Sequence, residues 1–221
     1  MMRWSRPEIQ NSVRELFRYM TGANERHYKA MIRVMKFCVD TPKRGLTLNP
    51  DESWDGSRDF KFLIDGILDL NYATCPKTRK SVSGWVVFLC GSPVAMKSAM
   101  QKIVTLSVTE AKFVSGTQCA QTMLYVMHIV QDMQLKVRKP MTLMMDNKGA
   151  INLANNYSMG GRTKHMDVHQ YFLRYLKEQG MIQTEWIEGE NNCSDIFTKN
   201  LQGPLFEKHA QNFVSEMEVD E

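Results

Sequence analysis

The order of strand-like and helix-like segments between residues 60 and 189 restricts the fold of this 221-residue chain more than any other feature. Three strand-like stretches follow one another with short links, at residues 60–73, 81–91 and 92–99. After them come a long helix at 107–135, an apolar strand at 141–146, helices at 147–156 and 163–180, a strand at 181–189, and helices at 193–201 and 204–217. Short links favour antiparallel neighbours and helical crossovers favour parallel ones. The sequence therefore predicts an α/β fold whose mixed five-stranded sheet, with three antiparallel and then two parallel strands, is flanked by helices.

The first 49 residues differ in pattern from the rest of the chain. Residues 6–20 and 24–41 carry apolar side chains at helical spacing, with Pro7 near the start of the first helix. Two amphipathic helices of this size make a poor independent domain. Residues 49–59 are polar and rich in turn formers. We therefore expect a helical segment at 1–49, a linker at 50–59 and the main domain at 60–221.

Composition excludes several classes of protein. No apolar run reaches the length of a membrane span, and the first ten residues lack the apolar core of a signal peptide. The five cysteines are scattered and form no C-x-x-C pair, which argues against a disulfide framework and a zinc site. The net charge of +4 is compatible with a polyanionic partner. A cytosolic or nuclear protein without membrane contact is expected.

Four acidic residues stand at the ends or centres of predicted elements: Asp69, Glu110, Asp146 and Asp195. Glu110 lies three residues after Ser107, as in a capping box, and Asp146 follows a strand in a position suited to an N-cap. Asp195 falls in the first turn of a predicted helix, where the dipole favours a negative charge. Asp69 has no such local explanation, because an acid in the middle of a strand needs solvent or a cation.

If the four carboxylates converge, they repel one another and raise each other's pKa. A pair of Mg²⁺ ions removes that cost, because hard cations prefer oxygen ligands. Two metal ions about 3.5–4 Å apart can stabilise both the attacking water and the leaving oxygen of a phosphodiester. The sequence therefore predicts a two-metal hydrolytic site that needs no nucleophilic side chain.

Several motifs resemble the RNase H domain of copia-type LTR retrotransposon polyproteins. The resemblance runs over about residues 60–207 and is carried by DLNYATCPKTRKSVSGWVVFLCGSPVAMKS, SVTEAKF, MMDNKGAINLANN, GGRTKHMDVHQYFLRYL and SDIFTKNLQGPLF. Residues 6–49 resemble the end of the reverse transcriptase region that precedes this domain, its thumb or connection part. The polymerase motif Y-x-D-D is absent from the sequence.

The resemblance implies an RNase H-like fold and cleavage of the RNA strand of RNA–DNA hybrids during reverse transcription. It implies that Asp69, Glu110, Asp146 and Asp195 are catalytic and bind two Mg²⁺ ions, with Mn²⁺ as an alternative metal. Asp65, in the same predicted strand, is the alternative for the first acid. The implied partners are the hybrid and the reverse transcriptase portion of the same polyprotein. The implied location is a cytoplasmic virus-like particle, with the nucleus as the alternative.

Three positions depart from the family pattern. Asn71 stands where the family has a second Asp, Lys112 where it usually has a second Glu, and Ala99-Met100 where it has a basic pair. The first two changes remove negative charge near the predicted site, and the third removes expected phosphate contacts.

Residues beside the acid motifs are candidates for contacts with nucleic acid, since phosphate contacts dominate affinity for such ligands. The candidates are Lys97, Lys102, Asn147, Lys148, Arg162, Lys164 and His165. His165 and His169 stand one helical turn apart, without an obvious third metal ligand, and His165 is a candidate for assisting product release.

Two other functions agree with the same residues. The chain could be a non-catalytic hybrid-binding module or a decayed element that keeps the fold. It could also be another RNase H-like nuclease that acts on DNA, such as an integrase or transposase core. The acid in SDIFTK, after the fifth strand, favours RNase H over this last class.

Overall fold

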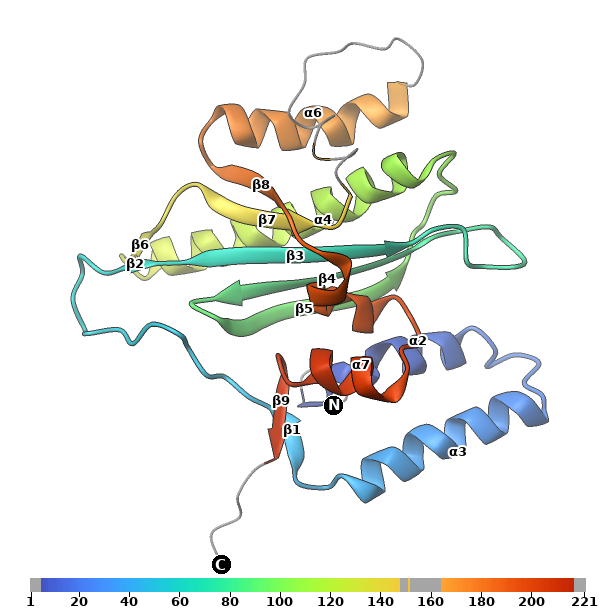
Figure 1. Cartoon of the computed structure of the whole chain (residues 1–221). Coiled ribbons are helices and arrows are strands. Elements are labelled where there is room, and N and C mark those ends of the chain that lie inside the picture. The colour runs from blue at the N-terminus through green and yellow to red at the C-terminus, as the bar shows by residue number, and fades with distance from the viewer. Residues whose placement is uncertain (1–4, 148–150, 152–163, 217–221) are drawn as a thin grey trace, which may run out of the picture.

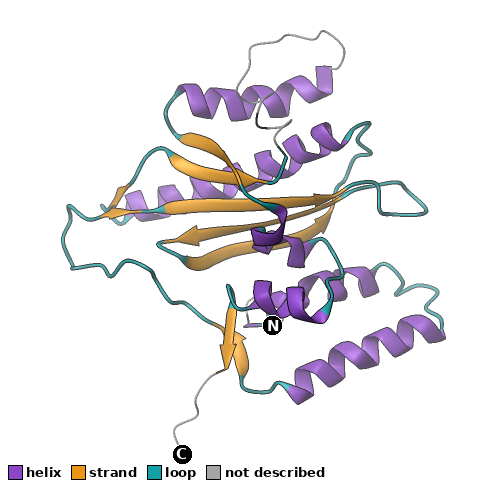
Figure 2. Ribbon diagram, viewed as in Figure 1, coloured by secondary structure: helices purple, strands orange, loops and turns teal. Residues whose placement is uncertain are grey.

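A computed structural model describes residues 5–147, 151 and 164–216, with the backbone alone for residues 164–167. The chain forms one central sheet with helices on both sides (Figures 1 and 2). Helices α4 (Val108–Asp132) and α6 (Lys164–Glu178) lie on one side of it, and α2 (Gln10–Phe17), α3 (Glu25–Asp40) and α7 (Gly203–Ala210) lie on the other. No helix in the described part of the chain is long and apolar enough to cross a membrane.

The central sheet has five strands in the order β5-β4-β3-β7-β8. Its strands are β3 (Ile64–Asn71), β4 (Val82–Leu89), β5 (Ser92–Met100), β7 (Met141–Met145) and β8 (Ile182–Trp186). Strands β3, β4 and β5 pair antiparallel, whereas β7 runs parallel to both β3 and β8. This topology confirms the predicted mixed sheet, and it is the RNase H-like α/β fold that the resemblance implies.

One face of the sheet packs against α4 and α6. Ile64 and Leu68 of β3 point toward this face, where they join Met123 of α4 and Leu173 of α6 in one buried cluster. Ser107 caps α4 as predicted, because its side chain accepts a hydrogen bond from the Glu110 backbone N–H. Helix α4 is therefore a core helix, since most of its side chains are shielded by the sheet or by α6.

The opposite face packs against the C-terminal part of the chain. Ile67 of β3 and Val86 of β4 contact Ile196 and Phe197 from the 3₁₀ helix η3 (Cys193–Phe197), and Phe213 after α7 completes this second cluster. Because successive strand residues face opposite sides, Asp69 lies on this face together with Ile67. The parity of β3 thus directs Asp69 toward η3.

The N-terminal helices are attached to this face. A 3₁₀ turn, η1 (Pro7–Ile9), leads into α2, in agreement with the predicted helix start at Pro7. Arg14 of α2 donates a 2.9 Å hydrogen bond to Ser98 of β5, and Asn11 donates one of 2.9 Å to Asn200. The three-part division at residues 49 and 59 stays a prediction.

Two small sheets were not predicted. β1 (Arg44–Leu46) pairs antiparallel with β9 (Val214–Glu216), and β2 (Lys61–Phe62) pairs parallel with β6 (Lys136–Val137). The expectation of a helix over 204–217 is therefore wrong at its end, because α7 stops at Ala210 and the chain turns into β9. The predicted helix at 193–201 is only the 3₁₀ turn η3. The predicted helix at 147–156 falls mostly outside the described residues.

Gly84 allows η3 to lie close to the sheet beside Asp69. Gly84 is the cross-strand partner of Asp69. A Cβ atom at Gly84 would lie 2.5 Å from Cγ2 of Thr198 and 2.9 Å from Cβ of Phe197. Neither neighbour can move without shifting the turn that carries it, so this position requires the absence of a side chain.

We expect Gly84→Ala to destabilise the protein by about 2 kcal/mol, because the added methyl group overpacks the contact between β4 and η3. The measurement is the free energy of unfolding by chemical denaturation. Gly203→Ala is the matched control, since a Cβ there meets no atom within 4 Å. Equal stability of the two variants would contradict this account of Gly84.

Candidate active site

Asp69 lies on β3, and Asp146 directly follows the neighbouring parallel strand β7. Leu68 of β3 is the register partner of Met145, the last residue of β7, and each of them is followed in sequence by one of the two acids. The Asp69 side chain contacts Thr198 and Lys199, which follow η3, whereas the Asp146 side chain contacts Lys112 of α4. The two strands that lead to these acids are adjacent, as predicted, and the joint binding of metal by the two acids stays a prediction.

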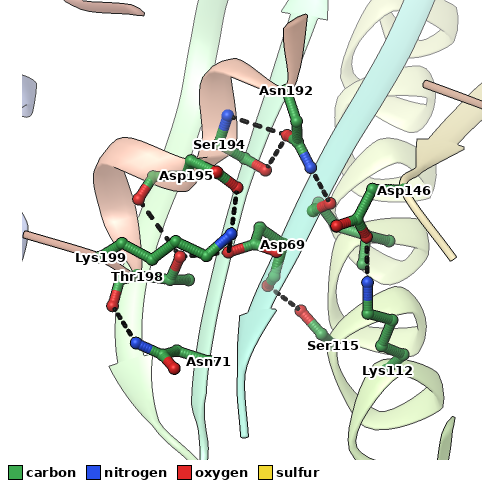
Figure 3. A network of polar contacts seen from close by, with 11 residues as sticks. Asp69, Asn71, Lys112, Ser115, Asp146, Asn192, Ser194, Asp195, Thr198 and Lys199 are labelled. Carbon is green, nitrogen blue, oxygen red and sulfur yellow. Dashed lines mark hydrogen bonds and ion pairs between the residues drawn. The ribbon is translucent and has the colours of Figure 1, made fainter. Parts of the chain in front are cut away.

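Asp69 is buried and surrounded by groups that stabilise its negative charge. Its side chain is 1% exposed and lies 3.2 Å from Nζ of Lys199, and the Thr198 hydroxyl donates a hydrogen bond to it (Figure 3). Burial alone would raise the pKa of Asp69, but the charge of Lys199 and the Thr198 hydrogen bond outweigh it and hold that pKa below its usual value. The charge of Lys112 acts in the same direction.

Asp195 shares Lys199 with Asp69. The Lys199 ammonium lies 2.8 Å from Oδ1 of Asp195, one helical turn earlier in the chain. Burial, followed by the negative charge of Asp69, raises the pKa of Asp195 to about 7. Burial would lower the pKa of Lys199, yet the two carboxylates raise it above its usual value. One ammonium therefore compensates two neighbouring carboxylates.

Asp146 has a second lysine as its partner. The Lys112 ammonium, from the beginning of α4, forms an ion pair with Oδ1 of Asp146 (Figure 3). The Lys112 side chain is only 5% exposed. Lysine is almost never buried without a partner, so Asp146 explains the inward position of this side chain.

η3 is fixed to the sheet by a buried asparagine. Nδ2 of Asn192 donates a 3.1 Å hydrogen bond to the Leu68 carbonyl, next to Asp69. Oδ1 of Asn192 accepts hydrogen bonds from the backbone N–H and the hydroxyl of Ser194, at 3.1 and 2.6 Å. Asn71 adds a 3.2 Å hydrogen bond from its amide to the Thr198 carbonyl, which an ionised Asp could not donate. The departure at Asn71 thus has a structural use.

Glu110 lies in the first turn of α4. Its Oε2 accepts a 2.6 Å hydrogen bond from the Leu106 N–H, so it helps to close the first turn of the helix. Within the described residues, no hydrogen bond or ion pair joins Glu110 to another predicted site acid. Its charge does act on His169 of α6, where burial lowers the pKa of the imidazole and Glu110 offsets part of that effect. Glu110 and His169 therefore lie close enough for their charges to interact.

Asp65, the alternative for the first acid, is placed differently. It lies four residues earlier on β3 and lines a cavity of about 470 Å³ together with Phe88 and Gln211. Four strand residues span about 13 Å. Burial raises the pKa of Asp65, and hydrogen bonds from Thr142 oppose that shift. Asp69, rather than Asp65, is the β3 acid that lies next to Asp195.

The predicted nucleic-acid contacts are only partly described. Lys97 lies on β5 with its side chain half-buried, and Lys102 follows β5 and is exposed. Asn147 is half-buried directly after Asp146. Lys148 and Arg162 lie outside the described residues, and only the backbone of α6 is described at Lys164 and His165. The contacts of these residues with nucleic acid stay predictions.

The contacts of Lys112, Lys199 and Asn192 at this site were not predicted from the sequence. Lys199 could have been suspected, because it stands one helical turn after Asp195. Asn192 precedes Cys193-Ser194 in the manner of a helix N-cap. No local sequence pattern predicts the contact of Lys112, since its partner Asp146 lies far along the chain, after β7.

The donor groups fit a divalent cation in kind. Carboxylate oxygens are the ligands that Mg²⁺ prefers, and the repulsion between Asp69 and Asp195 is what a cation would relieve. In the part of the chain that the structure describes, however, no three His, Cys, Asp or Glu side chains are grouped as ligands of one ion. The positive charge beside these carboxylates comes from Lys112 and Lys199.

Curated relatives of the chain are retrovirus-related Pol polyproteins. It is 25% identical over 216 residues, or 98% of its length, to the polyprotein from transposon RE1 of Arabidopsis thaliana. It is also 25% identical over 203 residues, or 92% of its length, to that from transposon TNT 1-94 of Nicotiana tabacum. The chain spans only 14% of the length of each polyprotein. No protein-family model matches the chain. The predicted resemblance to retrotransposon polyproteins is confirmed.

Among solved structures, the N-terminal RNase H domain of Rv2228c from Mycobacterium tuberculosis is similar to the chain. The match has a TM-score of 0.46 and 14% identity, and it covers 68% of this chain and 96% of that domain.

We expect Asn192→Ala to lower the free energy of unfolding by about 2–3 kcal/mol, because buried groups on β3 and η3 lose their hydrogen-bond partner. Asn191→Ala is the control at the exposed neighbouring residue. Denaturation followed by circular dichroism measures both. A loss of similar size in both variants would mean that the anchor is not specific to Asn192.

Asp195→Asn should stabilise the metal-free protein above pH 7 by roughly 1 kcal/mol, after allowance for solvent screening. The carboxyl has a pKa of about 7 when folded and an ordinary value of 3.8. Between these values the folded state binds more protons than the unfolded state, so native stability falls as pH rises. The gain from Asp195→Asn should therefore disappear toward pH 4.

Thermal unfolding from pH 4 to pH 8 tests this expectation. Asp132→Asn, at an exposed acid at the end of α4, is the control for the change in net charge. A gain from Asp195→Asn that does not vary with pH would be inconsistent with the raised pKa.

Proposed function

We propose that the chain, an RNase H-like domain related to retrotransposon Pol polyproteins, hydrolyses the RNA strand of RNA–DNA hybrids during reverse transcription. The main support is that Asp69 lies on β3 and Asp146 directly follows the neighbouring parallel strand β7, with Asp195 beside Asp69. Asp69 and Asp195, from distant parts of the chain, meet at Lys199, and Asp146 directly follows the strand next to that of Asp69. A lone capping role for each acid does not account for that meeting.

Four carboxylates would hold the divalent metal in this proposal: Asp69, Glu110, Asp146 and Asp195. When bound, Mg²⁺ or Mn²⁺ would supply the positive charge that stabilises the developing charge on the phosphate. Asp69 is suited to this role because its lowered pKa keeps it ionised at neutral pH. Thr198 and Lys199 orient its carboxylate through their contacts with Oδ2.

The proposed reaction is the addition of water across one phosphodiester bond of the RNA strand. A water oxygen bonds to phosphorus, the bond from phosphorus to the 3′ oxygen breaks, and that oxygen takes up a proton. The products are a 3′-hydroxyl and a 5′-phosphate. No side chain forms a covalent intermediate, so the acids act by holding and orienting groups rather than as nucleophiles.

The hybrid would lie across the same edge of the sheet. Lys102 is exposed directly after β5, and Lys97 lies on that strand. Cations there can contact phosphates and contribute affinity that depends on salt concentration. Recognition of the RNA strand would depend on its 2′-hydroxyl groups.

The reverse transcriptase portion of the same polyprotein is the proposed protein partner. An apolar cavity of about 370 Å³ lies between α2 and α3, lined by Leu16, Phe17, Tyr28 and Met31 among others. Phe17 is 65% exposed, which is unusual for a side chain of this size. Contact with a neighbouring region of the polyprotein would bury this surface.

Binding of hybrids without cleavage is the second candidate function. The observation that favours it is the pairing of Lys112 with Asp146 and of Lys199 with Asp69 and Asp195. A centre whose carboxylates already have cationic partners can be stable without metal.

Incubation of the purified chain with a labelled RNA–DNA hybrid and Mg²⁺ separates the two candidates. We expect cleavage of the RNA strand, reduced at least about a hundredfold in Asp146→Asn and Asp69→Asn, since each removes a charge from the site. Asp132→Asn, far along α4 from Glu110, should cleave at the native rate. Binding with native affinity but without cleavage, measured by fluorescence anisotropy, would support the second candidate instead.

A further inference from the structure

Lys112 differs from an ordinary helix lysine in its position. It lies near the start of α4, and its neighbours Ala111, Phe113 and Val114 are all buried. A lysine at such a position usually extends its ammonium group to water. Here the whole side chain is 5% exposed, and the ammonium is paired with the Asp146 carboxylate.

The close-up of the polar network shows where this ammonium lies (Figure 3). Lys112 reaches from α4 to Asp146 on the side of β3 where Ser115 hydrogen-bonds the Asp69 carbonyl. Asp146 is one of the acids that would hold a metal ion in the proposed function. The ammonium and a metal ion would therefore compete for the same carboxylate oxygens.

Lys199 is a weaker competitor than Lys112. Its side chain is 36% exposed, so its ammonium can turn into solvent when another cation approaches Asp69 and Asp195. Lys112 has no such freedom, because it is enclosed between α4 and the sheet. Displacing it from Asp146 leaves a buried positive charge without its partner, which is costly.

We propose that Lys112 is an internal counter-ion that occupies the cation position at Asp146 and thereby sets the affinity of this centre for divalent metal. The inference rests on the proposed function only in taking Asp146 as a metal ligand. It follows that the protein folds without metal and that metal binds weakly, because binding requires the lysine to withdraw.

Direct titration with Mn²⁺ tests the proposal without reference to activity. Free Mn²⁺ is read from its electron paramagnetic resonance signal at fixed pH and ionic strength. Lys112→Met keeps the length and apolar stem of the side chain and removes the charge, so we expect its dissociation constant to be about tenfold lower or more. Lys112→Glu, which adds an oxygen ligand, should bind at least as tightly as Lys112→Met.

Lys36→Met is the matched control, because it removes the same charge from an exposed lysine of α3 that has no part in the proposed site. Its dissociation constant should stay within about twofold of the native value, since exposed charges are screened. A native dissociation constant in folded Lys112→Met would overturn the proposal. So would an equal gain in affinity in Lys36→Met, because the effect would then be one of net charge.

Loss of folding in Lys112→Met is also informative. If Asp146 needs a cation, saturating Mn²⁺ should restore the native circular dichroism and the cooperative thermal transition of this variant. A variant that stays unfolded at saturating Mn²⁺ would overturn the proposal, because the metal would then be no substitute for the ammonium.

Failure of the proposed function gives a different result. If the native protein never cleaves hybrids but Lys112→Met raises the Mn²⁺ affinity, the counter-ion proposal stands and the proposed enzymatic function fails. If the native protein cleaves hybrids but Lys112→Met leaves the Mn²⁺ affinity unchanged, the proposed enzymatic function stands and the counter-ion proposal fails.

Discussion

The buried carboxylate of Asp69 is the constraint on which the rest of this centre depends. A charge in the middle of a sheet strand is stable only when other groups replace the water it has lost. Thr198 and Lys199 supply that replacement, and both come from the segment that follows η3. That segment can reach Asp69 because Gly84 has no side chain and because Asn192 ties η3 to β3. One strand position thus accounts for the close packing of the C-terminal part of the chain on the sheet.

The sheet and the long helix could be predicted because their signals are local. Residues 141–145 form a short apolar strand, Ser107 caps α4, and Gly180, with a φ of 63°, follows the end of α6. The alignment of Asp69 with Asp146 also follows from local pattern, once β3 and β7 are taken as parallel neighbours. What could be predicted of the candidate site is therefore the backbone position of its acids.

The partners of those acids could not be predicted, because they depend on contacts between distant residues. Lys112 was interpreted only as a loss of negative charge, whereas it is the ion-pair partner of Asp146. The predicted end of the helix over 204–217 was wrong for a similar reason. The stretch from Val214 has no strand signal of its own, and it is extended because β1 supplies its hydrogen-bond partners.

The pairing of β1 with β9 joins the strand that follows the N-terminal helices to the last described residues of the chain. Thr47 donates a 2.9 Å backbone hydrogen bond to Phe213, and Arg44 lies 2.5 Å from the Glu207 carboxylate. A protein cut at the polar stretch around residue 50 would expose the backbone of β9 as an unpaired edge and uncover the buried Phe213. Such edges invite pairing with other chains. A fragment that carries the acids therefore has to keep Arg44–Leu46, because this strand pairs with β9 and covers its backbone.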